Sequence, residues 1–100
     1  MNVPDLKWLA GLLEGEGCFT FHGDGRPQVI VHMTDADVVA KAARRMGVKP
    51  YGPYFDKKGS MPFFTANLYG PKARVLMRQL YPHMGARRRA RIRHILEEGT

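Results

Sequence analysis

The fold is decided by the stretch Leu9-Ala10-Gly11-Leu12-Leu13-Glu14-Gly15-Glu16-Gly17. Two of its features are unfavourable in an isolated helix. Gly11 and Gly15 each cost about 1 kcal/mol relative to Ala in a helix interior. Glu14 and Glu16 place negative charge at the C-terminal end of the helix, where the dipole disfavours each by about 0.3–1 kcal/mol. A sequence that keeps both features is expected to gain something at this point.

The glycines and the acids suggest what that gain is. Gly11 and Gly15 lie four residues apart on one helix face and would allow another backbone to approach closely. Two such helices side by side would bring two Glu16 carboxylates together, and a divalent cation would relieve their repulsion. Hard cations such as Mg²⁺ take oxygen ligands of this kind. The alternative is an ordinary helix end with incidental surface acids.

Periodicity and turn signals on both sides of this stretch predict the order α-β-β-α-β-β-α-α. The expected helices cover residues 2–15, 35–46, 71–81 and 86–98, and the expected strands cover 18–22, 28–33, 51–56 and 63–69. Gly17 and Gly47 are the predicted helix stops, and Thr34 is the predicted N-cap of the second helix. Prolines in the second pair of strands favour irregular or edge strands.

This order predicts one α+β domain over residues 1–100. Two hairpins form a four-stranded sheet with the helices on one face. The other face of the sheet carries polar or mixed side chains. It is therefore expected to be free to meet a partner.

The charge favours a polyanionic partner. Sixteen Lys and Arg against nine Asp and Glu give the 100-residue chain a formal net charge of +7. Nucleic acid is the commonest partner of such a chain, although a merely basic soluble protein is the alternative. Cys18 is the single cysteine, no apolar run is long enough for a membrane span, and the N-terminus does not read as a signal peptide. A cytoplasmic, soluble protein is expected. The scattered histidines do not form a zinc pattern.

The stretch quoted above resembles the LAGLIDADG motif of homing endonucleases. The matching positions are Leu9, Ala10, Gly11, Leu12 and the closing pair Glu16-Gly17. The predicted element order is similar to that family over essentially the whole chain. The resemblance implies an αββαββα(α) fold whose antiparallel sheet forms a DNA-binding saddle. It also implies a metal-dependent endonuclease of intron homing that makes a staggered double-strand cut in a long, roughly palindromic site.

The chain has one copy of the motif, so the resemblance implies a homodimer with isologous contacts. The implied interface residues are Trp8, Gly11, Leu12 and Gly15. Glu16 is the implied catalytic acid and metal ligand, and Gly15 would offer a backbone carbonyl near the metal. The implied metal is Mg²⁺, or another divalent cation such as Mn²⁺, or Ca²⁺ in a non-cleaving state. Glu16 stands where the family usually has Asp and is one methylene longer.

Two further catalytic positions follow from the resemblance. Asp35 matches a polar or acidic position near the scissile phosphate, although a helix N-terminal charge is the alternative role. Arg87 or Arg89 matches a basic position at the start of the last helix, where a cation would stabilise charge developing on the phosphate. The alternative for each arginine is a phosphate contact or a solvated helix face.

The resemblance also places the strands in the major groove of double-stranded DNA, where base edges are distinguishable. The predicted DNA-binding residues are Thr20, His22, Arg26, Gln28, Ile30, His32, Tyr54, Asp56, Lys57, Lys58, Thr65, Asn67, Arg87 and Arg89. Arg26 and Gln28 are the best candidates for guanine and adenine contacts. An exposed sheet face without a ligand is the alternative for any one of them. The alternative functions are a non-cleaving DNA-binding regulator, an RNA maturase, or a small RNA-binding or ribosome-associated protein.

Overall fold

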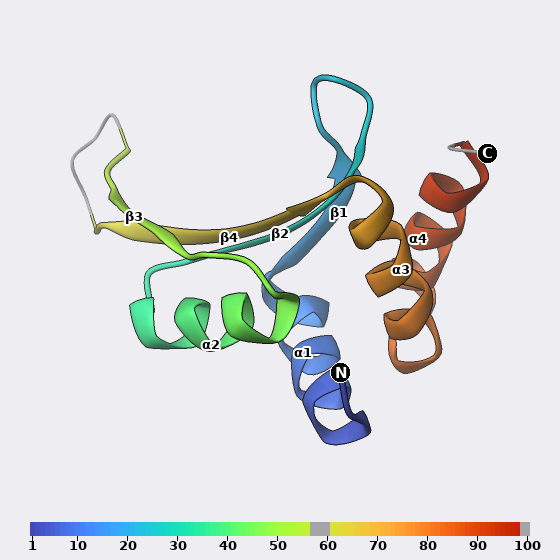
Figure 1. The fold of residues 1–100 in the computed structure, drawn as a ribbon, viewed down its shortest axis with the longest axis horizontal. Helices are drawn as coiled ribbons and strands as arrows, with labels where there is room; N and C mark the ends of the chain where they lie inside the picture. The colour runs from blue at the N-terminus through green and yellow to red at the C-terminus, as the bar shows by residue number, and fades with distance from the viewer. Residues whose placement is uncertain (57–60, 99–100) are drawn as a thin grey trace.

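A four-stranded antiparallel sheet with the strand order β1-β2-β4-β3 runs through the molecule (Figure 1). The computed structural model describes residues 1–56 and 61–98. The strands are β1 (Gly17–Phe21), β2 (Pro27–Met33), β3 (Tyr51–Tyr54) and β4 (Phe63–Tyr69). The helices are α1 (Val3–Glu16), α2 (Ala36–Met46), α3 (Gly70–Leu80) and α4 (Ala86–Glu98), with a 3₁₀ turn at Tyr81–His83. The predicted α+β order is confirmed.

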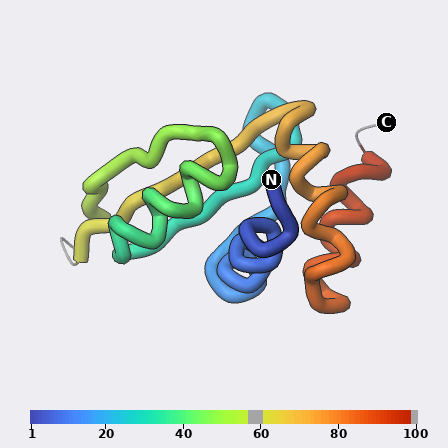
Figure 2. Tube along the Cα trace, turned by 60° about the horizontal axis from the view of Figure 1, so that its bottom comes forward, coloured from blue at the N-terminus to red at the C-terminus, as the bar shows by residue number. Residues whose placement is uncertain are grey.

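The core lies between one face of the sheet and the helices. Phe19, Val29 and Leu68 are partners across β1, β2 and β4, and all three are buried against the helix layer. From α1, Leu9 and Leu13 enter the same core. Figure 2 shows α1 between α2 and the α3–α4 pair, so the helices cover a single side of the sheet. None of the described helices is long and apolar enough to cross a membrane.

Local sequence explains where the helices begin and end. The Oδ1 of Asn2 accepts a hydrogen bond from the N–H of Asp5 at 2.9 Å and caps α1. Gly47 adopts a left-handed conformation (φ 74°) and ends α2, as predicted. The N-cap of α2 is Asp35, one residue later than the predicted Thr34, and its side chain makes no capping hydrogen bond.

The last two strands differ from each other as their sequences suggest. β4 is regular and pairs with β2 from Phe64 to Tyr69. β3 is a short edge strand with an irregular register between Tyr51 and Tyr54, and its Gly52–Pro53 peptide bond is cis. It ends at Tyr54 instead of the predicted Asp56, because a strand that contains Pro53 lacks a donor for a continuous ladder.

Candidate nucleic-acid interface and acidic site

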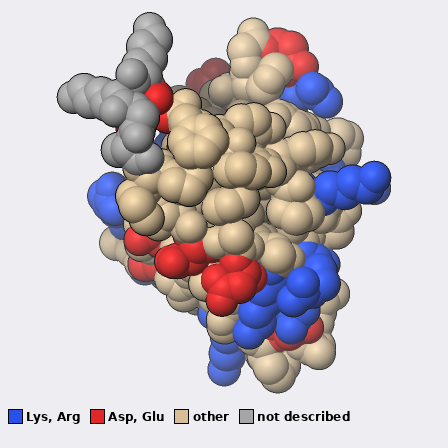
Figure 3. All heavy atoms as spheres, turned by 90° about the vertical axis from the view of Figure 1, so that its left-hand side faces the viewer, with Lys and Arg blue, Asp and Glu red and all other residues tan. Residues whose placement is uncertain are grey.

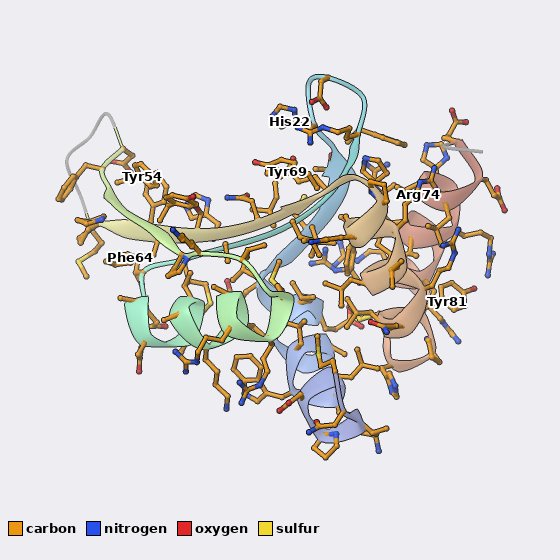
Figure 4. The ribbon with its side chains drawn as sticks, viewed as in Figure 1. His22, Tyr54, Phe64, Tyr69, Arg74 and Tyr81 are labelled. Atoms are coloured by element: carbon orange, nitrogen blue, oxygen red, sulfur yellow. The ribbon has the colours of Figure 1, made fainter. Side chains whose placement is uncertain are left out.

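The face of the sheet opposite the helices is polar, and no described helix covers it. Strand pairing aligns Thr20, Gln28 and Tyr69 in one row. A second row contains Ile30 and Asn67, and a third contains His32 and Thr65. In Figure 4, Tyr54 and Tyr69 lie on this open side, whereas Phe64 points toward α2. The strands therefore place the predicted DNA-facing residues of β1, β2 and β4 on one face.

Gln28 differs from its neighbours on the open face because it is only 7% exposed. Its Nε2 donates to Oδ1 of Asn67 at 3.4 Å, and Nδ2 of Asn67 donates to Oγ1 of Thr65 at 3.2 Å. These three side chains form an internal chain of hydrogen bonds across β2 and β4. The predicted adenine contact by Gln28 would require this chain to rearrange.

The turn between β1 and β2 holds a compact polar cluster. Oδ2 of Asp24 lies 2.7 Å from Nε of Arg26, and Oδ1 accepts from the backbone N–H of Arg26 at 3.0 Å. The guanidinium of Arg26 lies over the ring of Tyr69, 5.1 Å from its centroid. The Arg26 backbone N–H, helped by the Arg26 and His22 side chains, lowers the pKa of Asp24 from 3.8 to about 2. Sequence reasoning selected His22 and Arg26 but missed Asp24 and Tyr69.

An aromatic row crosses the other end of the open face. The rings of His32 and Phe63 are 4.2 Å apart, and those of Phe63 and Tyr54 are 5.6 Å apart. Asp56 is exposed just beyond β3. The predicted phosphate contacts Lys57 and Lys58 lie outside the described residues.

Glu16, the last residue of α1, is exposed and lines a shallow pocket with Asp35. The pocket has a volume of about 330 Å³, and its other walls are His32, Met33, Thr34 and Phe63. The Asp35 carboxylate is not used to cap α2. Both predicted acids are thus brought to one pocket beside the open face. Figure 3 shows acidic side chains gathered beside basic ones on this side of the molecule.

Glu14 has a structural role that the sequence did not reveal. Its Oε1 accepts from the N–H of Gly85, and its Oε2 lies 3.6 Å from Nε of Arg88. The same guanidinium donates to the carbonyl oxygens of Gly17 at 2.8 Å and Glu14 at 3.2 Å. Arg88 therefore supplies the positive charge at the C-terminal end of α1, whose last turn has no basic residue. Glu14 is therefore neutralised within the chain, unlike Glu16.

The other arginines of α4 divide into two groups. Nε of Arg91 donates to the carbonyl oxygen of Phe19 at 3.0 Å, and Arg93 donates to the Tyr81 hydroxyl. Arg88 and Arg91 together satisfy carbonyl groups on the free edge of β1. Arg87 and Arg89 are exposed, and their side chains make no hydrogen bond or ion pair with the described part of the chain. The spacing of these arginines did not indicate which of them packs inward.

The predicted interface on α1 is uncovered. Gly11 and Gly15 are exposed, and a Cβ atom at either position would meet nothing within 4 Å. Trp8 and Leu12 are half-buried, and Nζ of Lys41 lies 4.3 Å from the Trp8 ring centroid. Packing within this chain therefore does not require glycine at either position.

Comparison with known proteins identifies the fold. No protein-family model matches the sequence, and no curated protein sequence matches it. A solved structure of the homing endonuclease I-CvuI with its target Sro1.3 and 2 mM Ca matches with a TM-score of 0.70 at 18% identity, over 96% of this chain and 68% of that one. The chain has the LAGLIDADG homing-endonuclease fold. A second I-CvuI structure, with the I-CreI target C1221 and 2 mM Mg and with the DNA not cleaved, matches with a TM-score of 0.66 at 18% identity over the same shares of the two chains.

The homing-endonuclease fold brings some of the predicted catalytic residues together and leaves one apart. Glu16 and Asp35 share the pocket at the end of α1. Arg87 does not line that pocket, although it lies in the first turn of α4. Among the described residues, no group of three or more His, Cys, Asp and Glu side chains is placed to hold a metal ion.

Proposed function

We propose that this protein is a homodimeric, metal-dependent DNA endonuclease that makes a staggered double-strand cut in a long, roughly palindromic site. The observation that carries the proposal is the pocket shared by Glu16 and Asp35 at the edge of the uncovered sheet face. The fold supports it, since the structural neighbours are homing endonucleases solved with DNA. In each strand the 3′-oxygen would leave and become a 3′-hydroxyl, and the downstream fragment of the same strand would keep the 5′-phosphate.

The glycines of α1 support the dimer. Each costs helix stability, and neither is needed to avoid a clash within the chain. A second copy of α1 packed along Trp8, Gly11, Leu12 and Gly15 would make use of both. Such a contact around a twofold axis would bring the two acidic pockets near each other, as a cut in both strands requires.

The oxygen donors at the pocket suit a divalent cation. Mg²⁺ is typically held by one or two carboxylates together with substrate phosphates. Glu16 and Asp35 would provide the carboxylates, and Gly15 would provide a carbonyl. A bound metal would polarise the phosphoryl group and make a bound water more acidic. Glu16 and Asp35 would orient that water, and one exposed arginine, Arg87 or Arg89, would reach the phosphate.

The open sheet face supports duplex DNA as the substrate. It presents Thr20, His32, Thr65 and Asn67 at the spacing of neighbouring strands. Two neighbouring strands such as β2 and β4 form a ribbon that fits the major groove. The formal charge of +7 favours approach to phosphates.

Cleavage of a randomised plasmid library in Mg²⁺ tests the proposal. The wild type is expected to cut specific sites and leave 5′-phosphate ends. Glu16→Gln should lower the cleavage rate by about 10²-fold or more and leave DNA affinity within about threefold. Asp37→Asn is the matched control, because Asp37 is an exposed acid of α2 that does not line the pocket. Specific binding without any cleavage by the wild type would overturn the endonuclease and favour a regulator.

The aromatic row His32–Phe63–Tyr54 favours a second candidate function, RNA binding by a maturase. Unpaired RNA bases stack on exposed aromatic side chains of sheets. Competition between duplex DNA and structured RNA separates the two candidates. Duplex DNA is expected to compete better. A preference for RNA that is lost in Tyr54→Ala would support the maturase instead.

A further inference from the structure

In the turn between β1 and β2, the carboxylate of Asp24 accepts two hydrogen bonds from Arg26. Asp24 accepts from the backbone N–H of Arg26 at 3.0 Å and from its Nε at 2.7 Å. Nδ1 of His22 lies 3.2 Å from Oδ1 of Asp24. The Arg26 side chain is thus anchored at its base and at the near end of its guanidinium.

The ring of Tyr69 lies against the same guanidinium. It lies under Arg26, with 5.1 Å from Cζ to the centroid, and His22 packs on it edge-on at 5.1 Å and 87°. Tyr69 and His22 lie on the open side of the sheet in Figure 4. Arg26 is therefore held at the DNA-facing surface.

This arrangement leaves a defined part of Arg26 available. The Nε position is occupied by Asp24, whereas no described residue accepts a hydrogen bond from Nη1 or Nη2. The side chain remains 54% exposed. The two free nitrogens form a fork that matches the O6 and N7 acceptors of guanine in the major groove. An acid this close to DNA is unfavourable beside phosphates, so its presence requires a compensating role.

We propose that Asp24 is a positioning residue that holds Arg26 for end-on, bidentate recognition of one guanine in each half-site. This inference rests on the proposed DNA-binding function. Tyr69 and His22 pack beside this guanidinium, and the bond from Nε to Asp24 leaves its two terminal nitrogens without a described partner. Without Asp24, Arg26 would swing freely and reach phosphates as readily as bases, which would add affinity without sequence information.

Selection of binding sites from a random duplex library, with the full chain, tests the inference. The wild type should prefer guanine at one position per half-site by about tenfold or more. Replacing that guanine with 7-deazaguanine should lower its affinity by a comparable factor. Arg26→Ala and Asp24→Asn should each reduce this preference below threefold and keep the preferences at other positions. Asp24→Asn keeps an oxygen acceptor for the turn, so the hairpin should still form, and circular dichroism checks this.

A merely structural Asp24 would give a different pattern. Asp24→Asn would then lower affinity equally for all sites and leave the guanine preference intact, and that result would overturn the inference alone. A wild type that binds no duplex DNA would overturn both this inference and the proposed function. A second measurement uses the free protein: ¹⁵N relaxation should show Arg26 Nε ordered in the wild type and mobile in Asp24→Asn. An Arg26 Nε as mobile as that of the exposed Arg87 would also overturn the inference.

Discussion

Gly17 marks the point where α1 passes into β1 without a loop. A Cβ atom at this position would clash with Cδ2 of Leu13 and lie 2.8 Å from its Cα, so only glycine fits. We expect Gly17→Ala to lower the free energy of unfolding by about 1–3 kcal/mol through overpacking. Gly23→Ala is the control, because a Cβ there would meet nothing within 4 Å. Urea unfolding measures both. Equal effects of the two changes would show that the contact with Leu13 does not constrain the chain.

The lowered pKa of Asp24 predicts how the stability of the fold depends on pH. The folded pKa of about 2 lies below the ordinary 3.8, so the carboxylate stabilises the fold fully above 3.8. That contribution is lost as the pH falls from 3.8 toward 2. An NMR titration of the Asp24 carboxyl group should therefore have its midpoint near 2. Arg26→Ala should raise the midpoint only in part, because the backbone N–H, which is the main cause of the shift, remains. An unshifted wild-type midpoint would contradict the geometry of the turn.

At the scale of elements, α4 and the edge of β1 form one structural unit. Arg88 and Arg91 donate to the carbonyls of Gly17 and Phe19, which point away from β2. The side chain of Arg88 is only 15% exposed and also pairs with Glu14. Arg88→Ala should destabilise the fold by about 1–3 kcal/mol, since hydrogen bonds from charged groups to buried partners are lost. Arg87→Ala, on the same helix but exposed, should change stability by less than about 0.5 kcal/mol. Denaturant unfolding compares the two variants.

On the uncovered face of α1, replacing a glycine should raise the stability of the subunit and lower the affinity of the proposed dimer. Gly11→Ala should stabilise the isolated subunit by about 0.5–1 kcal/mol, because Ala favours the helix and has room. The same change should weaken the proposed dimer by about tenfold or more if two α1 backbones meet there. Sedimentation across a protein concentration series measures the dimer. A more stable subunit with unchanged association would contradict an α1–α1 interface.

At the scale of the whole molecule, the net charge should govern the proposed DNA affinity more than any single contact does. Each +7 chain keeps Arg87 and Arg89 free of internal partners among the described residues. A dimer that contacts six or more phosphates should lose about 10³-fold in affinity between 50 and 200 mM salt. The double change Arg87→Ala and Arg89→Ala should make that dependence shallower, whereas Asp37→Asn should not. Affinity that is insensitive to salt would argue against a phosphate-tracking interface.

Local sequence determined the elements and the class of the fold. Asn2 caps a helix, and Gly17 and Gly47 end helices, because these positions depend on their own backbone and nearest neighbours. Alternation along the predicted strand 28–33 separated the core face of β2 from its open face for the same reason. The ends of β3 and the cap of α2 were less well predicted. Proline and competing capping residues leave more than one local solution there.

Tertiary structure alone decided the partners of the charged groups. Glu14 and Glu16 look alike in the sequence, yet Glu14 meets Arg88 and Glu16 meets the pocket of Asp35. The five closely spaced arginines of α4 likewise separate into those whose side chains bind other groups of the chain and those whose side chains have no described partner. Charge acts through space, and the distance between two charges far apart in the chain is set by how helices pack on the sheet. Secondary structure follows from neighbours in sequence, whereas the chemistry of the site follows from neighbours in space.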